Sequence, residues 1–308
     1  MDAGSSPPIL PFQGTPRAEV AVDRALVAAL LAEQHPDLAG LALALVDEGW
    51  DNVMYRLGED LAVRVPRRAA AATLIEHELA WLPRLAPGLP VAVPAPLRAG
   101  TPGCGYPWRW SVLPWIRGTS GDIGEPGDGE ALALAAFFRA LHVPAPPDAP
   151  RNPVRGVPLA HRRRMVEERL ARVAKATTLV TPALARIWHE ALDAPMDAPD
   201  TWIHGDLHAR NVLVSAGRIA GIIDWSDMAA GDRATDLAAI WGLFASREAR
   251  EEAMRACGDL SEATWARARG WAFAFGVMLL DSGMADHPRH AAMGERTLRR
   301  LAEGPGSR

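Results

Sequence analysis

Lysine and cysteine are both scarce in this chain of 308 residues. Among the 33 basic residues only Lys175 is a lysine, so the first half of the chain cannot support chemistry that requires a lysine side chain. The two cysteines, Cys104 and Cys257, lie far apart and form no Cys-x-x-Cys pair. This spacing argues against a disulfide framework and against a thiolate zinc site, and we expect two reduced thiols.

Long hydrophobic runs are missing as well. A membrane span needs about 20 apolar residues in a row, and the apolar stretch at residues 26–46 is interrupted by charged residues and a proline. Residues 1–14 carry no basic residue ahead of their short apolar run, unlike a secretory signal. We therefore expect a cytoplasmic protein that has no membrane partner.

The charge balance is slightly acidic, with 37 acidic residues against 33 basic ones and a net charge of −4. This balance does not indicate the broad basic surface that binds nucleic acid or anionic lipid, and it favours a cationic small molecule. Hydrophobic residues make up 49% of the chain, which is enough for one large or two modest domains. Disorder is thereby excluded as the main state.

The hydrophobic pattern divides the chain into a strand-rich first part and a helical second part. Short apolar runs separated by tight turns predict an antiparallel meander in the first part, and the fold class is therefore α+β. The expected strands are residues 41–46, 52–57, 61–65 and 108–115, and the expected helices are residues 18–34 and 69–85. After a Gly-rich loop at 117–129, the expected helices are residues 130–142, 159–175, 181–192, 232–244, 248–257, 261–280 and 289–302.

The most informative segment is His-Gly-Asp-Leu-His-Ala-Arg-Asn at residues 204–211, with Asp224 following at the end of a short apolar run. A carboxylate on a rigid loop, such as Asp206, can accept a proton from an attacking hydroxyl. The Asn211 carbonyl and a second carboxylate, Asp224, offer the hard oxygen ligands that Mg²⁺ prefers. Phosphoryl transfer from a nucleotide needs this division of labour.

The succession H-G-D-L-H-x-x-N, I-I-D-W and G-D-x-x-x-D-L-A resembles the aminoglycoside phosphotransferase family, whose members share the protein-kinase fold. The resemblance implies a bilobal molecule, with a small antiparallel-sheet N-lobe in residues 1–117 and a larger helical C-lobe in residues 118–308. His-Gly-Asp and Asp-Trp-Ser stand where protein kinases have His-Arg-Asp and Asp-Phe-Gly. This difference favours a small-molecule kinase.

The same resemblance implies roles for individual residues. Asp206 corresponds to the catalytic base, Asn211 and Asp224 to the magnesium ligands, Asp236 to a structural carboxylate, and His204 to a brace of the loop. The family also needs a phosphate-binding cation in the N-lobe, and because lysine is absent there, Arg64 takes this place. Its acidic partner is expected to be Glu78 rather than Glu76. The remaining nucleotide contacts are expected from Gly49 and Asn52 of the covering loop and from Leu113 and Trp115 of the hinge.

The acceptor pocket is expected from the C-terminal helices, where the sequence is least informative. The side chains that we single out for substrate contact are Trp50, His208, Asp227 and Asp281. Trp50 sits on the loop that covers the nucleotide, and the two aspartates are counter-charges for a cation. Such residues are also common on solvated surfaces.

The predicted function is transfer of the γ-phosphoryl group of ATP or GTP, with Mg²⁺, to a hydroxyl of a small molecule. By resemblance the acceptor is an antibiotic, an aminoglycoside by default, with macrolide, peptide and nucleoside antibiotics as alternatives; the modification would give resistance or self-protection. Three other readings stay open: a choline- or sugar-like metabolite acceptor, a metal-dependent phosphoesterase built on His204, Asp206 and His208, and a binding protein without catalysis. The oligomeric state and the choice between ATP and GTP are not determined by the sequence.

Overall fold

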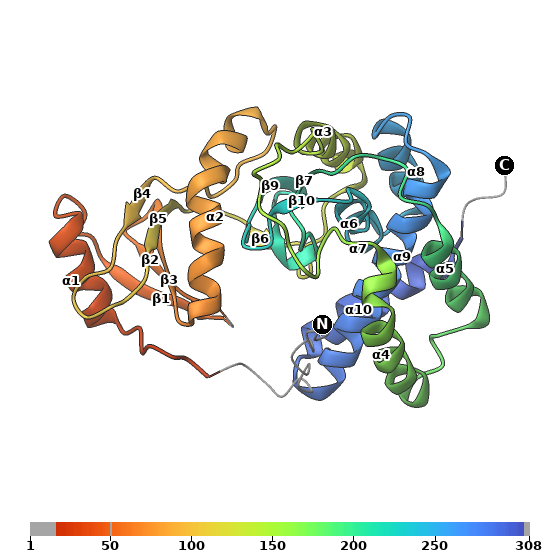
Figure 1. Ribbon diagram of the computed structural model, residues 1–308, viewed down its shortest axis with the longest axis horizontal. Coiled ribbons are helices and arrows are strands. Elements are labelled where there is room, and N and C mark those ends of the chain that lie inside the picture. Colours follow the sequence, from red (N-terminus) through yellow and green to blue (C-terminus); the bar gives the residue numbers. More distant parts are fainter. Residues whose placement is uncertain (1–16, 50, 305–308) are drawn as a thin grey trace, which may run out of the picture.

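The computed structural model describes residues 17–49 and 51–304. Figure 1 shows a sheet at one end of the molecule and most of the helices at the other end. The sheet has five antiparallel strands in the order β1-β2-β3-β5-β4. The bounds in this part are α1 (Arg24–Gln34), β1 (Leu43–Glu48), β2 (Asn52–Leu57), β3 (Leu61–Pro66), α2 (Ala69–Leu85), β4 (Arg98–Gly100) and β5 (Trp110–Pro114).

Alternation along the central strands decides which side chains face the first core. Tyr55 of β2 lies opposite Val63 of β3, and both are buried against α1 together with Val65. Since neighbouring residues of a strand point to opposite faces, Arg64 faces away from this core. It faces α2, which contacts β3 and β5.

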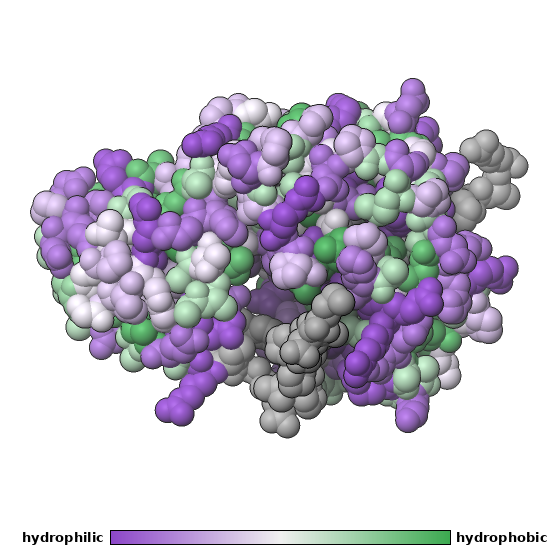
Figure 2. All heavy atoms as spheres, in the orientation of Figure 1, coloured by the Kyte–Doolittle hydropathy of each residue, from purple (hydrophilic) through white to green (hydrophobic). Residues whose placement is uncertain are grey.

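The helical part is organised around α9, a helix of 25 residues that α4, α5, α6 and α10 surround. Because it has neighbours on most sides, α9 is apolar over much of its circumference. The helices of this part are α3 (Ala131–Leu141), α4 (Arg163–Ala176), α5 (Pro182–Asp193), α6 (Ala234–Leu237), α7 (Ala239–Leu243), α8 (Arg247–Ala256), α9 (Glu262–Asp286) and α10 (Pro288–Ala302). In Figure 2, hydrophilic and hydrophobic residues are interspersed over the visible face.

Two small sheets lie between the large sheet and the helices (Figure 1). One pairs β7 with β10, and the other has the order β6-β8-β9. Their bounds are β6 (Thr119–Ser120), β7 (Thr201–Ile203), β8 (Val212–Ser215), β9 (Arg218–Ile222) and β10 (Ala229–Gly231). The loop from β7 to β8 and the loop from β9 to β10 meet at one place, and these loops carry the His-Gly-Asp and Asp-Trp-Ser motifs of the sequence.

Several boundaries differ from the predicted ones. Residues 117–129, which we expected to form a loop, contain β6, because Thr119 and Ser120 pair with β8. The predicted helix at 232–244 is divided into α6 and α7. The first helix begins at Arg24 instead of residue 18, since Asp23 caps it by accepting a hydrogen bond from the Leu26 N–H. Among the described residues, no helix is long and apolar enough to cross a membrane.

Candidate active site

Asp236 anchors the loop that follows β7. Its carboxylate accepts hydrogen bonds from the backbone N–H of His204, at 2.7 Å, and from that of Gly205, at 2.9 Å. His142 Nε2 lies 3.2 Å from the same carboxylate. Because Asp236 is fully buried, these bonds are shielded from water and fix the start of the loop.

His204 connects this loop to the loop that carries Asp224. Its Nδ1 accepts a hydrogen bond from the backbone N–H of Asp206 at 3.3 Å, so its Nε2 carries the proton and donates to the Ile223 carbonyl at 3.0 Å. The ring also packs against Trp225, with ring centres 4.8 Å apart. The histidine thus contacts both loops.

Gly205 allows two chain segments to approach closely. Its φ is +86°, and a Cβ atom at this position would lie 2.5 Å from the Asp227 carbonyl oxygen. A residue with a side chain does not fit there. The glycine of the His-Gly-Asp motif therefore brings Asp227 next to Asp206.

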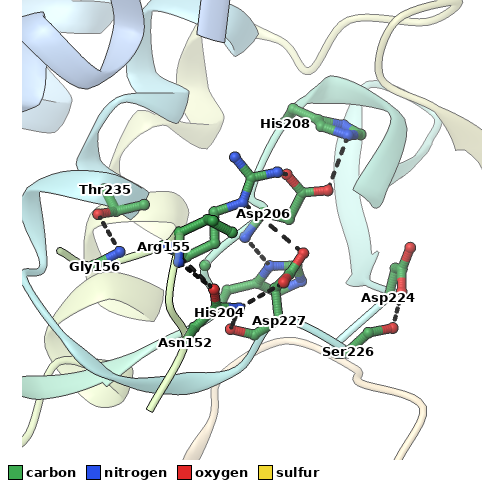
Figure 3. Close-up of polar contacts among 12 residues, drawn as sticks. Asn152, Arg155, Gly156, His204, Asp206, His208, Asp224, Ser226, Asp227 and Thr235 are labelled. Atoms are coloured by element: carbon green, nitrogen blue, oxygen red, sulfur yellow. Dashed lines mark hydrogen bonds and ion pairs between the residues drawn. The ribbon is translucent and has the colours of Figure 1, made fainter. Parts of the chain in front are cut away.

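Asp206 lies between Arg155 and His208 (Figure 3). Arg155 Nη2 is 2.6 Å from its Oδ1, and His208 Nε2 is 3.5 Å from its Oδ2. Burial raises the pKa of Asp206, but the charges of Arg155 and His208 outweigh this effect and hold the pKa well below its usual range. The carboxylate is thus kept ionised, as a proton acceptor must be.

Arg155 was not predicted as a site residue. It belongs to residues 150–157, which we call the strap and which crosses the loops of the site. The strap is fixed where Gly156 meets Gly231: a Cβ on Gly156 would lie 2.9 Å from Gly231 Cα, and the Asp232 N–H donates to the Gly156 carbonyl at 2.9 Å. The Asn-Pro and Arg-Gly pairs of this segment indicate a turn. Nothing in the sequence places that turn on Asp206, 51 residues later.

Asn152 at the start of the strap holds Asp227. Its Nδ2 donates to Asp227 Oδ1 at 2.6 Å, and its Oδ1 accepts from the backbone N–H of Arg155 at 3.0 Å. Burial and the negative charge of Asp206 raise the pKa of Asp227. In Figure 3, Asp227 points toward Arg155 and lies beside the Asp206 carboxylate.

Asn211 and Asp224 fit a magnesium ion. The Asn211 amide donates from Nδ2 to the Asp206 carbonyl at 2.9 Å, which leaves its Oδ1 as the free ligand atom. Its backbone carbonyl accepts from the N–H of Ile223 at 2.8 Å, so Asp224, the next residue, is close. Within the described ranges, no cluster of three or more His, Cys, Asp or Glu side chains forms a metal site. Two hard oxygen ligands suit Mg²⁺, which usually keeps several waters.

Asp224 has an unusual backbone conformation, with a φ of +62°. Its Oδ1 accepts from Ser226 Oγ at 2.7 Å and from Arg64 Nη2 at 3.1 Å. Desolvation raises the pKa of Asp224. Arg64 and Ser226 together lower it by more than desolvation raises it, so the net pKa is below the ordinary value. Strained residues of this kind gather at functional sites, where the surrounding structure maintains them.

Arg64 is bound by groups from three elements. Its Nη1 lies 2.6 Å from Oε2 and 2.9 Å from Oε1 of Glu78 on α2, and this pair is almost fully buried. Its Nη2 contacts Asp224 and also Ser226 Oγ. With the Asn52 amide oriented so that its oxygen faces Arg64, Asn52 accepts from Nε at 3.2 Å and from Nη2 at 3.0 Å. Glu76, by contrast, lies on the surface near Arg109.

The other expected nucleotide residues lie around the sheet. The Gly49 carbonyl accepts from Arg67 Nη1 at 3.0 Å, and its N–H donates to the Asn52 carbonyl at 2.9 Å. Leu113 is buried on β5. Trp115 follows β5, where its ring lies under Arg56 at 4.3 Å.

Four residues were expected to contact the acceptor, and two of them, Trp50 and Asp281, are not found beside Asp206 in the described structure. Trp50 lies outside the described residues. Asp281 is on α9 and does not touch Asp206; both of its carboxylate oxygens are bound by Arg169 and Arg172. Of the four residues, the structure therefore brings His208 and Asp227 to the Asp206 carboxylate.

The chain is similar in sequence to known proteins. The family model described as "Phosphotransferase enzyme family" matches residues 42–271. The Bacillus subtilis (strain 168) protein YcbJ is 25% identical over 162 residues, which cover 52% of this chain and about half, 51%, of that protein.

Solved structures extend the comparison to the whole fold. The GDP complex of aminoglycoside 2'-phosphotransferase-IIIa superposes with a TM-score of 0.63, at 19% identity, over 92% of this chain and 99% of that chain. The macrolide 2'-phosphotransferase MphH from Brachybacterium faecium superposes with a TM-score of 0.57, at 24% identity, over 93% and 100%. The predicted α+β fold with a sheet lobe and a larger helical lobe is thereby confirmed.

Proposed function

This chain belongs to the phosphotransferase enzyme family, and on that basis we propose that it transfers the γ-phosphoryl group of ATP or GTP to a hydroxyl of a small molecule. The observation that carries the proposal is the convergence of Asp206, Asn211 and Asp224 on two adjacent loops. The first is an ionised carboxylate, and the other two present oxygen atoms suited to Mg²⁺. We assign the N-lobe to residues 1–117, the C-lobe to residues 118–308, and the protein to the cytoplasm.

The transfer uses Asp206 as the proton acceptor. The acceptor hydroxyl oxygen forms a bond to the γ-phosphorus while the bond from that phosphorus to the β–γ bridging oxygen breaks. The hydroxyl proton passes to a carboxylate oxygen of Asp206, and the nucleoside diphosphate leaves with the electron pair of the broken bond. Arg155 orients the carboxylate through its contact with Oδ1, which leaves Oδ2 to face the hydroxyl.

Asn211 and Asp224 would hold Mg²⁺. When bound, the ion offsets the negative charge of the phosphate oxygens. Asp224 Oδ1 is already oriented by Ser226 and Arg64, so the side chain needs little rearrangement to present Oδ2. Arg64 would then bind phosphate oxygens with the fork of its guanidinium, and Glu78 would keep that fork in place.

The similar solved structures bear the names of aminoglycoside and macrolide 2'-phosphotransferases. These names support an antibiotic as the acceptor, and resistance or self-protection as the biological role. The phosphoesterase reading has less support, because no metal-binding cluster of His and carboxylate residues is present in the part of the chain that the structure describes. A metabolite acceptor stays the second candidate, because the side chain of Arg155 lies beside Asp206.

The test is Mg²⁺-dependent consumption of ATP and of GTP by the purified protein against a panel of hydroxylated antibiotics and metabolites. Turnover with one class of acceptor is expected, and Asp206→Ala should reduce it at least about 100-fold while nucleotide affinity stays nearly unchanged. If the variant retains comparable turnover, Asp206 is not the base. If the protein binds neither nucleotide, the kinase proposal fails.

A further inference from the structure

One face of α9 carries arginine contacts that begin at the catalytic carboxylate. Arg155, which binds Asp206, also lies over Phe275, with its Cζ atom 5.0 Å from the ring centre. Three residues further along α9, the sulfur of Met278 lies 3.9 Å from Arg162 Nη2. Positions three apart share a helix face, and this step advances about 4.5 Å along the axis.

The same face continues to Asp281, another three residues along the helix. Arg169 Nη1 lies 2.9 Å from its Oδ2, and Arg172 Nε lies 2.8 Å from its Oδ1. This carboxylate is only 10% exposed and is already shared by two cations. We call Arg155, Arg162 and Arg169 the guanidinium row; it extends from Asp206 along α9 for about 9 Å.

Arg162 is the member of the row whose charge is least compensated. Among the described residues, no carboxylate lies within ion-pair distance of it, and its buried Nε has no hydrogen-bond acceptor. Burial and the positive charges of Arg155 and Arg169 lower the pKa of Arg162 to about 10. A partly buried cation that other cations repel is stabilised when an anion approaches.

We propose that the acceptor carries an oxyanion, a carboxylate or phosphate group, which Arg162 binds while a hydroxyl of the same molecule reaches Asp206. This inference rests on the proposed phosphotransferase function and specifies its substrate class. The contacts that Arg155 and Arg162 make with α9 are three residues apart, about 4.5 Å along the helix axis, so the anionic group would lie near the accepting hydroxyl. Arg169 borders the outer end of this subsite, where Asp281 orients it.

The acidic net charge of the chain favoured a cationic acceptor, but the local charge of this surface is the opposite. A cation placed along the row would meet the guanidinium of Arg162 without a carboxylate to balance it. Asp281, which the sequence suggested as a counter-charge for a cation, is instead bound by Arg169 and Arg172. Local charge acts over a few ångströms and outweighs net charge within a partly buried site.

The first experiment measures oxyanion binding alone. The protein is saturated with Mg²⁺ and a non-hydrolysable ATP analogue, so that the phosphate positions of the nucleotide are filled, and is then titrated calorimetrically with sulfate at constant ionic strength. The wild-type protein is expected to bind sulfate. Arg162→Gln should weaken this binding about tenfold, since a hydrogen bond to a charged group is lost.

Arg164→Gln is the matched control, because Arg164 lies two residues further along the chain, in the first turn of α4, but is exposed and paired with Glu168. It should bind sulfate like the wild type. Arg162→Lys, which keeps the charge, should retain most of the affinity, and thermal unfolding of each variant shows that the fold is intact. The proposal is overturned if the wild type binds no sulfate, or if Arg162→Gln and Arg164→Gln behave alike.

The second experiment distinguishes the two sources of the oxyanion. Hydroxycarboxylates and sugar phosphates are assayed as acceptors beside their neutral counterparts, the amides and the free sugars, and Arg162→Gln should raise KM for the anionic member by about tenfold with less effect on kcat. Equal use of neutral and anionic members, with no effect of Arg162→Gln, would refute the inference while leaving the phosphotransferase function standing. Sulfate binding that depends on Arg162, without turnover of any acceptor, would refute the phosphotransferase function and with it the assignment of the oxyanion to an acceptor.

Discussion

Arg64 and Asp224 are 160 residues apart in the chain, yet Nη2 of Arg64 lies 3.1 Å from Oδ1 of Asp224. The same guanidinium binds Glu78 through Nη1. A side chain of the sheet lobe thus contacts an expected magnesium ligand of the helical lobe directly. A triphosphate that binds between the lobes must take over part of this contact, so Arg64 exchanges one anionic partner for another.

Arg64→Lys is expected to raise KM for ATP by about tenfold, because one ammonium group cannot bind Glu78 and a phosphate in the fork geometry of arginine. Arg64→Met should in addition lower the free energy of unfolding by about 3–5 kcal/mol, since it leaves the buried Glu78 carboxylate without its cation. Steady-state kinetics and chemical denaturation measure the two effects. Arg98→Lys, at an exposed position of β4, is the control, and a KM as low as that of the control would contradict the phosphate-binding role of Arg64.

Arg155→Met is expected to move the acid limb of the pH profile of kcat/KM to higher pH. Arg155 keeps the pKa of Asp206 low, and Asp206 accepts a proton only when ionised, so loss of the arginine raises the pH below which activity falls. Profiles measured between pH 4 and 9, for the variant and for Arg155→Lys, test this expectation. Superimposable profiles for wild type and Arg155→Met would show that Arg155 does not set the ionisation of the base.

Gly205→Ala should abolish turnover and lower the free energy of unfolding by about 1–3 kcal/mol or more. The new methyl group would lie 2.5 Å from the Asp227 carbonyl oxygen, so the two loops would have to separate. Gly217→Ala is a matched control, because Gly217 also has a positive φ, +76°, but has open space around it. An active Gly205→Ala enzyme would mean that the close approach to Asp227 is dispensable.

Stability is expected to fall as the pH decreases from about 6.5 to about 4, partly because of His290. Burial and the charge of Arg210 lower the pKa of His290 from 6.5 to about 4, and Arg210 Nη1 donates to its Nε2 at 2.7 Å. Between these values the unfolded state binds the proton more readily than the folded state. The contribution of His290 to the free energy of unfolding is therefore complete above pH 6.5 and is lost as the pH falls from 6.5 to about 4.

Denaturation of His290→Gln at several pH values tests this expectation. Between pH 7 and 4, the free energy of unfolding of the variant should fall by about 1–2 kcal/mol less than that of the wild type, because glutamine does not titrate. His189→Gln, at an exposed position of α5, serves as the control. Identical slopes for both variants would assign the acid sensitivity to other groups.

The sequence predicted the parts of the site that lie close together in the chain. Asp206 and Asn211 are five residues apart on one loop, and the fork of Arg64 toward Glu78 joins a strand to the helix that follows it. In each case local spacing determines the geometry. The helices were found for a similar reason, since their apolar periodicity is a local property. Most differ from the prediction only at their ends, whereas the helix predicted at 232–244 is divided into α6 and α7.

The position of Arg155 could not be predicted in this way. It reaches Asp206 because Gly156 and Gly231 touch, and a contact between two glycines leaves no hydrophobic or charge pattern in the sequence. The guanidinium row has the same origin, because it combines Arg155 of the strap, Arg162 of the 3-10 turn before α4 and Arg169 of α4 along one face of α9. Net charge suggested a cation for the acceptor, whereas these tertiary contacts produce a local excess of positive charge.

The contact between Gly156 and Gly231 also bears on how new specificity arises in this enzyme. This contact fixes the strap at one point, next to Arg155. Residues beyond the strap, including those of α4, can therefore change while Asp206 keeps its geometry. Selection for a different acceptor has freedom at positions 162 and 169 without a penalty in the transfer step. Mutant libraries restricted to residues 159–176 and the facing side of α9 are therefore a direct route to changing the proposed acceptor.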